Sequence, residues 1–212
     1  MLPAIRKNVS AVIIPQKHLE SAIEANQFAL NHYALAISGR LCGCDGDLNL
    51  YEKTTFLTLF PYFSQQHLGL LKESATDSDS VYINCKRFNK FSNDNLTITA
   101  RFFARLFNLA IADDSLNVME ISFLEKVSSM LGLSKEFLEK ALEYHFIDSI
   151  KFEKKFVNND GVKNYYRRQI TKLHPDLFSE NNVLSNRIKN KIVWLATERM
   201  KILNENYSKS LS

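Results

Sequence analysis

Apolar residues recur at helical spacing in the C-terminal part of the chain. Val162, Tyr166, Ile170 and Leu173 fall on one side of a predicted helix. A second helical stretch carries a matching stripe, made of Ile188, Ile192, Leu195, Arg199 and Ile202, with Leu203 and Tyr207 beside it. We expect the two stretches to pack on each other as an antiparallel hairpin, with Trp194 as a packing residue.

The first 150 residues show the same periodicity. Helices are predicted over Ala29–Leu41, Leu50–Phe60, Thr97–Ile111 and Val118–Leu131. A further helix should begin after Ser134 and continue through Phe146, with His145 packed on its apolar side. Residues 72–95 are polar, and we expect a long loop there, with at best a short extended piece at 81–85. The 212 residues include only six Gly and four Pro, which favours an all-α fold class.

A repeat lies between these predicted helices. The segment Asp45–Glu52 reappears 68 residues later as Asp113–Glu120, with Asp, Leu, Asn, an apolar residue and Glu in register. Asn49 and Asn117 can each cap the following helix, and the Glu three residues later can bond back to the cap's N–H. The repeat therefore predicts two helix–loop–helix units, each closed by a capping box.

Charge divides the chain into two parts. Residues 151–212 carry 13 Lys and Arg against 6 Asp and Glu, a net of +7, whereas residues 1–150 carry 14 against 17, a net of −3. The C-terminal part should therefore have its own partner. The three cysteines lack C-x-x-C spacing, which argues against a disulfide framework or a zinc site and favours a reducing compartment. Cys42-Gly43-Cys44 is interpreted as a helix end.

No apolar stretch approaches the ~20 residues that a membrane span needs. The N-terminal run Val9–Ile14 is too short and lacks the features of a signal peptide. We expect a cytoplasmic protein, peripheral at most to a membrane complex.

The candidate functional residues surround a tripeptide, His174-Pro175-Asp176. Pro175 cannot continue a helix, so the tripeptide should form a turn that displays His174 and Asp176 at the end of the preceding helix. The polar face of that helix carries four cations, at Lys163, Arg167, Arg168 and Lys172. Like charges spaced i,i+4 repel slightly, so this face suits an acidic partner better than helix stability.

A basic helix, an HPD turn and a return helix ending Ile202-Leu203-Asn204-Glu205-Asn206-Tyr207 resemble the J domain of DnaJ-type co-chaperones. The resemblance implies that the turn contacts a DnaK-type ATPase chaperone and stimulates its ATP hydrolysis. The implied chaperone-binding residues are His174, Pro175, Asp176, Lys163, Arg167, Arg168 and Lys172. Because the chemistry takes place in the partner, His174 is not interpreted as a general base of this chain.

The doubled helix–loop–helix, followed by Leu131-Gly132-Leu133-Ser134, resembles the TerB-like helical domain over residues 25–148. A TerB-like domain before a J-like one is the order of the DjlA-type co-chaperones. The implied organisation is an N-terminal segment at 1–24, a TerB-like domain at 25–150 that contains the loop 72–95, and a J-like hairpin at 157–212. Residues 157–161 form the predicted boundary.

The acidic residues of the repeat are also candidate metal ligands. Asp45, Asp47 and Asn49 alternate as in a calcium-binding EF-hand, but Leu50 and Phe56 stand where that loop needs Gly and Glu. We therefore expect helix caps and not a calcium loop. The TerB-like family is associated with metal and tellurite stress, which leaves five residues as candidate ligands: Asp45, Asp47, Glu52, Asp113 and Glu120. No cofactor is expected.

Two functions fit these patterns. The first is a co-chaperone or adaptor that engages a DnaK-type chaperone, while the TerB-like domain binds a client or partner. The second is a non-catalytic structural or adaptor subunit of a larger bacterial assembly, such as a secretion system. The second is favoured by Leu177, where the J family usually has Lys, and by the lack of a recognisable first J helix before Val162. That helix is replaced either by a remnant at Phe152–Phe156 or by the last TerB-like helix.

Enzymatic activity is not expected, because the sequence contains no phosphate-binding loop, zinc spacing or nucleophile motif. The basic C-terminal part carries no recognisable nucleic-acid-binding motif, so we expect no nucleic-acid partner.

Overall fold

The computed structural model describes residues 16–44, 46, 48–76, 81–113, 115–148 and 159–211. Every regular element in these ranges is helical, which confirms the all-α fold class. The elements of the first half are α1 (Gln16–Cys42), α2 (Leu50–Leu59), the 3₁₀ turn η1 (Gln65–His67), α3 (Leu68–Thr76), α4 (Val81–Phe91) and α5 (Leu96–Ala110). Those of the second half are α6 (Val118–Met130), α7 (Lys135–Glu143), the π-helical turn η2 (Tyr144–Asp148), α9 (Asn159–Lys172), α10 (Asp176–Ser179) and α11 (Asn186–Leu211).

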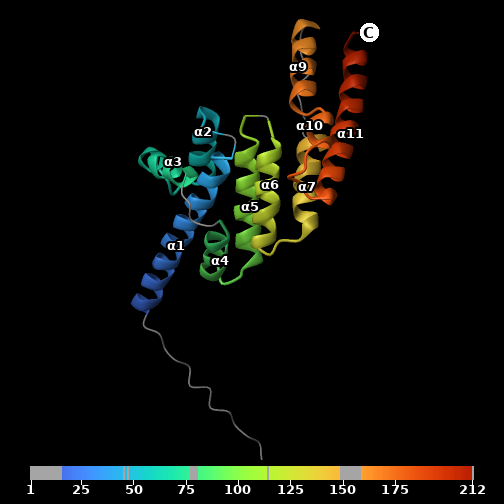
Figure 1. Cartoon of the computed structure of the whole chain (residues 1–212). Coiled ribbons are helices and arrows are strands. Elements are labelled where there is room, and N and C mark those ends of the chain that lie inside the picture. The colour runs from blue at the N-terminus through green and yellow to red at the C-terminus, as the bar shows by residue number, and fades with distance from the viewer. Residues whose placement is uncertain are drawn as a thin grey trace, which may run out of the picture.

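Helices α1 to α7 form a bundle, and α9 with α11 forms an antiparallel hairpin at one end of it (Figure 1). The long helix α1 packs against α3, α4 and α5, while α7 and η2 pack against α11. Gly39 allows the close approach of α1 to α3, because a Cβ there would lie 2.5 Å from the Leu71 carbonyl oxygen. The helix α1 ends at Cys42, as predicted, and no disulfide joins any of the three cysteines.

The bundle and the hairpin share one continuous core. Phe103 and Phe146 of the bundle are fully buried, and so are Ile192 and Leu195 of α11, all in a single apolar cluster. The hairpin predicted from the two apolar stripes is present, with the rings of Tyr166 and Tyr207 stacked at 4.5 Å between centroids. The hairpin is therefore an integral part of the packed molecule.

Both predicted capping boxes are present. Asn49 Oδ1 accepts a hydrogen bond from the Glu52 amide at 2.9 Å, and the Asn49 amide donates to Glu52 Oε2 at 2.7 Å. In the second copy the corresponding distances between Asn117 and Glu120 are 3.0 and 2.9 Å. The two helix–loop–helix units thus start α2 and α6 with the same local hydrogen bonds.

The loop predicted at 72–95 is wrong. Residues 72–76 complete α3, and residues 81–91 form α4, including the segment 81–85 for which a short extended piece was the expectation. Asn84, Cys85 and Phe88 are buried at helical spacing, so a narrow buried face fixes α4 although five of its eleven residues are Asn, Lys or Arg. Burial raises the pKa of the Cys85 thiol to about 12.

Three further predictions have different outcomes. The helix after Ser134 continues through the buried Phe146, and His145 is packed as expected. Trp194, predicted to be a packing residue, instead leaves 51% of its surface exposed, with Lys191 Nζ 4.8 Å above its ring. The proposed remnant at 152–156 lies outside the described residues, and α7 with η2 packs on α11.

Candidate functional site

The His174-Pro175-Asp176 turn follows the end of α9, as the sequence predicted, and its Asp176 begins the short helix α10. His174 Nδ1 is 3.3 Å from both the Asp176 amide nitrogen and Asp176 Oδ2. A neutral ring with its proton on Nε2 accepts from the amide, and a protonated ring can donate to the carboxylate. The side chains of His174 and Asp176 are 36% and 84% exposed, so a partner can reach both.

Hydrogen bonds and one buried ring hold the turn in place. The Leu177 amide donates to the His174 carbonyl at 3.0 Å, and the Phe178 amide donates to the Pro175 carbonyl at 3.1 Å. Phe178 is fully buried and meets Phe146 of η2 edge-on at 5.9 Å. Because Phe178 points into the core, its neighbour Leu177 is turned outward and is 52% exposed.

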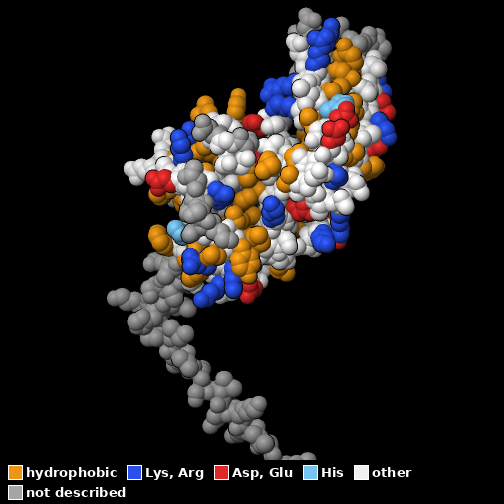
Figure 2. Space-filling model, in the orientation of Figure 1, with side chains coloured by type: hydrophobic (Ala, Val, Ile, Leu, Met, Phe, Trp, Pro, Cys, Tyr) orange, Lys and Arg blue, Asp and Glu red, His pale blue; other side chains and the backbone are white. Residues whose placement is uncertain are grey.

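The four predicted cations of α9 do not share one environment. Lys163, Arg167 and Arg168 are exposed to solvent, whereas Lys172 is half-buried. Lys172 Nζ donates to the main-chain carbonyl of Asp113 at 2.6 Å. This bond links the HPD end of α9 to the loop between α5 and α6, where the second copy of the repeat lies. Figure 2 shows Lys and Arg side chains at the end of the molecule formed by α9 and α11.

A buried arginine joins the three elements around the site. Arg199 of α11 donates through Nη1 to the carbonyls of His145 and Phe146, at 3.2 and 2.8 Å. Its Nη2 donates to Gln169 Oε1 of α9 at 2.5 Å. Burial, together with the nearby Arg199 guanidinium, lowers the pKa of His145 to about 4. The sequence placed Arg199 on the apolar stripe but gave no signal for these partners, which lie 30 to 54 residues away.

The described acidic residues that were candidate metal ligands form hydrogen bonds near the starts of α2 and α6. Glu52 and Glu120 are buried in the capping boxes, and Asp113 Oδ1 accepts from the Ser115 amide at 2.9 Å and its hydroxyl at 2.5 Å. Asp45 and Asp47 lie outside the described residues. Across the described part of the chain, no group of three or more His, Cys, Asp or Glu side chains could hold a metal ion.

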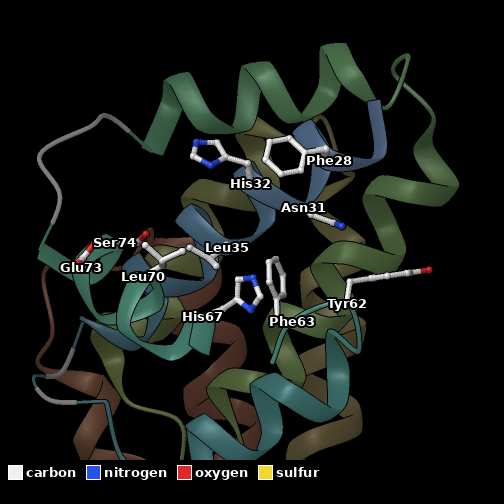
Figure 3. A pocket seen from close by; sticks show the side chains of 10 residues that line it. All are labelled: Phe28, Asn31, His32, Leu35, Tyr62, Phe63, His67, Leu70, Glu73 and Ser74. Atoms are coloured by element: carbon white, nitrogen blue, oxygen red, sulfur yellow. The ribbon is translucent and has the colours of Figure 1, made fainter. Parts of the chain in front are cut away.

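A hollow that the sequence did not indicate lies between α1, the η1 region and α3 (Figure 3). Its volume is about 610 Å³. The lining consists of Phe28, Asn31, His32, Leu35, Tyr62, Phe63, His67, Leu70, Glu73 and Ser74. Phe28 is 78% exposed and Tyr62 is 67% exposed, so the rim presents large apolar side chains to solvent. No single segment supplies the hollow, and for this reason no local pattern predicts it.

Within the described ranges, no helix combines the length and the apolar character that crossing a membrane would need. Comparisons with protein-family models, with curated proteins and with solved structures gave no match to this chain.

Proposed function

We propose that this protein is a cytoplasmic, non-catalytic co-chaperone or adaptor that engages a DnaK-type chaperone through the HPD turn and α9. The observation that carries the proposal is the turn itself: His174 and Asp176 are solvent-exposed at the end of a basic helix. Lys163, Arg167 and Arg168 extend a positive surface along that helix, which would attract an acidic partner surface.

The helical bundle would bind the client or partner. Support comes from the apolar hollow between α1 and α3, since exposed apolar clusters on folded proteins mark interaction sites (Figure 3). The bundle and the hairpin share one core, so a protein bound to the bundle would be carried at a fixed position relative to the HPD turn.

A structural or adaptor subunit of a larger bacterial assembly, such as a secretion system, is the second candidate. Two observations favour it. Lys172 is engaged with the Asp113 carbonyl, so the basic surface has three exposed cations where the sequence suggested four. Leu177 next to the turn presents an apolar side chain. In this alternative, the hairpin is a packed scaffold with no effect on a chaperone.

The test is the steady-state ATPase rate of a DnaK-type chaperone, measured with wild-type protein and with His174→Gln. We expect the wild type to raise the rate and the variant to lose this effect. The side chain of His174 is partly solvent-exposed and lies outside the core, so the variant should keep its helical circular dichroism spectrum. Absence of stimulation by well-folded wild type would refute the chaperone contact, and co-purification with an unrelated assembly would then support the second candidate.

A matched pair of variants tests the basic surface separately. Arg167→Ala/Arg168→Ala removes two positive charges from α9, and Lys86→Ala/Lys90→Ala removes two from the exposed face of α4. Because α4 lies at the opposite end of the molecule (Figure 1), we expect only the α9 variant to weaken the stimulation. Equal losses from both would indicate a general charge effect.

A further inference from the structure

The outward face of α5 forms a groove with α7. We call it the α5–α7 groove; it has a volume of about 430 Å³ and is lined by Leu96, Thr97, Ala100, Arg101, Ala104 and Phe137. Leu96 is 64% exposed at one end. The ring of Phe137 is held edge-on against the buried Phe103, at 5.7 Å between centroids. Figure 2 shows hydrophobic side chains gathered over α5 with Lys and Arg side chains on either side.

The shape of this groove fits a helix. Leu96, Ala100 and Ala104 follow one another at intervals of four residues, the spacing of a surface row in helix–helix packing. The two alanines leave room for side chains of an incoming helix. The main-chain groups of α5 are used within the helix, so a docked segment would have to satisfy its own N–H and C=O groups, as a helix does.

The charge around the groove is positive. Helix α5 carries Arg101 and Arg105 and no acidic residue. The three glutamates of α7, at positions 136, 139 and 143, are paired with Arg187 and Lys191 of α11. Arg101 lines the groove, and Arg105 lies one turn further along with its guanidinium 5.6 Å from the centre of the Phe60 ring. No carboxylate belongs to the lining residues. Glu136, the neighbour of Phe137, faces Arg187, and Asp94 lies in the turn before α5.

We propose that the α5–α7 groove binds an amphipathic helix of a partner protein, with small and aliphatic residues on its inner face and Asp or Glu along its flanks. Leu96 and Phe137 would provide the apolar contacts, and Arg101 would pair with a carboxylate at the rim. This proposal rests on the partner-binding part of the proposed function and does not depend on the chaperone contact.

The probe is an amidated helical peptide of about 15 residues, the length of α5, with Leu and Ala on one face and Glu on the flanks. Two companion peptides replace Glu by Gln or by Lys. Binding to the full chain is followed by fluorescence anisotropy at about 50 and about 200 mM salt. We expect the Glu peptide to bind tightest, and its affinity to fall at the higher salt.

Two substitutions and a control locate the binding. Arg101→Glu should lower the affinity for the Glu peptide by about tenfold and raise the affinity for the Lys peptide, because reversing the charge at the rim turns attraction into repulsion and repulsion into attraction. Ala104→Trp, at an exposed helix position, should block the groove for all three peptides without changing charge. Lys201→Glu on α11 is the matched control, with an expected change of less than about twofold, because Lys201 is exposed and does not line the groove, so its charge acts only through screening solvent.

Equal binding of the Glu and Lys peptides, an effect of Lys201→Glu equal to that of Arg101→Glu, or no binding of any peptide would overturn the groove proposal. The Arg101→Glu protein is also assayed for stimulation of the chaperone ATPase. Absence of peptide binding with intact stimulation would refute the groove alone. Peptide binding without stimulation would refute the chaperone contact alone.

Discussion

Arg199 offers the sharpest test of how the hairpin is held on the bundle. Its side chain is only 3% exposed, and it joins η2 and α9 to α11 through three hydrogen bonds. The change Arg199→Met removes the guanidinium and keeps an unbranched side chain of similar reach, so loss of apolar packing contributes little. The difference in stability then reports mainly on the hydrogen bonds.

The expected loss in the free energy of unfolding comes from the acceptors that lose their donor in Arg199→Met. The carbonyls of His145 and Phe146 and Oε1 of Gln169 each lose a charged donor inside the protein. Leaving a buried acceptor unsatisfied costs about 1–3 kcal/mol. The substitution also removes the cost of keeping a guanidinium out of water, which offsets part of this loss. We therefore expect Arg199→Met to lower the free energy of unfolding by about 3 kcal/mol.

The assay is urea-induced unfolding at pH 7, followed by circular dichroism and analysed by linear extrapolation. Lys201→Met is the matched control, because Lys201 lies two residues away on α11 and forms an exposed ion pair with Glu198. An exposed pair of this kind contributes less than about 1 kcal/mol. A loss of stability for Arg199→Met no larger than for Lys201→Met would refute the reasoning.

A double-mutant cycle separates one of the three bonds. Gln169→Leu alone and together with Arg199→Met gives the coupling between the two side chains, which we expect to be about 1–3 kcal/mol for a buried, charge-assisted bond. A coupling energy near zero would show that the contact between Arg199 and Gln169 does not contribute to stability, whatever the single variants cost.

Two further predictions concern the buried His145 and the helix cap formed by Asn117. The pKa of His145 is lowered from 6.5 to about 4, so as the pH falls the unfolded chain binds this proton before the folded chain does. The free energy of unfolding should therefore be highest above pH 6.5 and about 2 kcal/mol lower at pH 5. The variant His145→Gln should lose this difference between the two pH values in urea titrations. Asn117→Ala should cost about 1 kcal/mol through loss of the capping bonds to α6, and Asn117→Gly only a few tenths, in the same assay. Equal costs for the Ala and Gly variants would contradict the capping role, and a pH-independent stability would contradict the buried neutral state of His145.

Local hydrogen bonding explains why much of the fold was predictable. Asn49 and Asn117 lie three residues before the glutamates they exchange bonds with, so each helix start is encoded within four residues. The HPD turn was predictable for the same reason, since Pro175 ends α9 irrespective of the surroundings. In contrast, α4 was missed because only a narrow face of it is buried and its apolar residues alternate with Asn, Lys and Arg, so its helical state depends on burial against α1 and α6.

Contacts between segments distant in the sequence depend on how the helices pack, and the sequence alone did not predict them. The apolar stripe of α11 was evident in the sequence, but a stripe does not reveal which carbonyls Arg199 meets. The basic face of α9 was equally evident, yet Lys172 bonds to the Asp113 carbonyl, 59 residues away, while its three companions stay in solvent. The α5–α7 groove and the hollow at α1 and α3 are formed by side chains from separate helices. Periodicity fixes the side of a helix on which a residue lies, and tertiary packing fixes what that side faces.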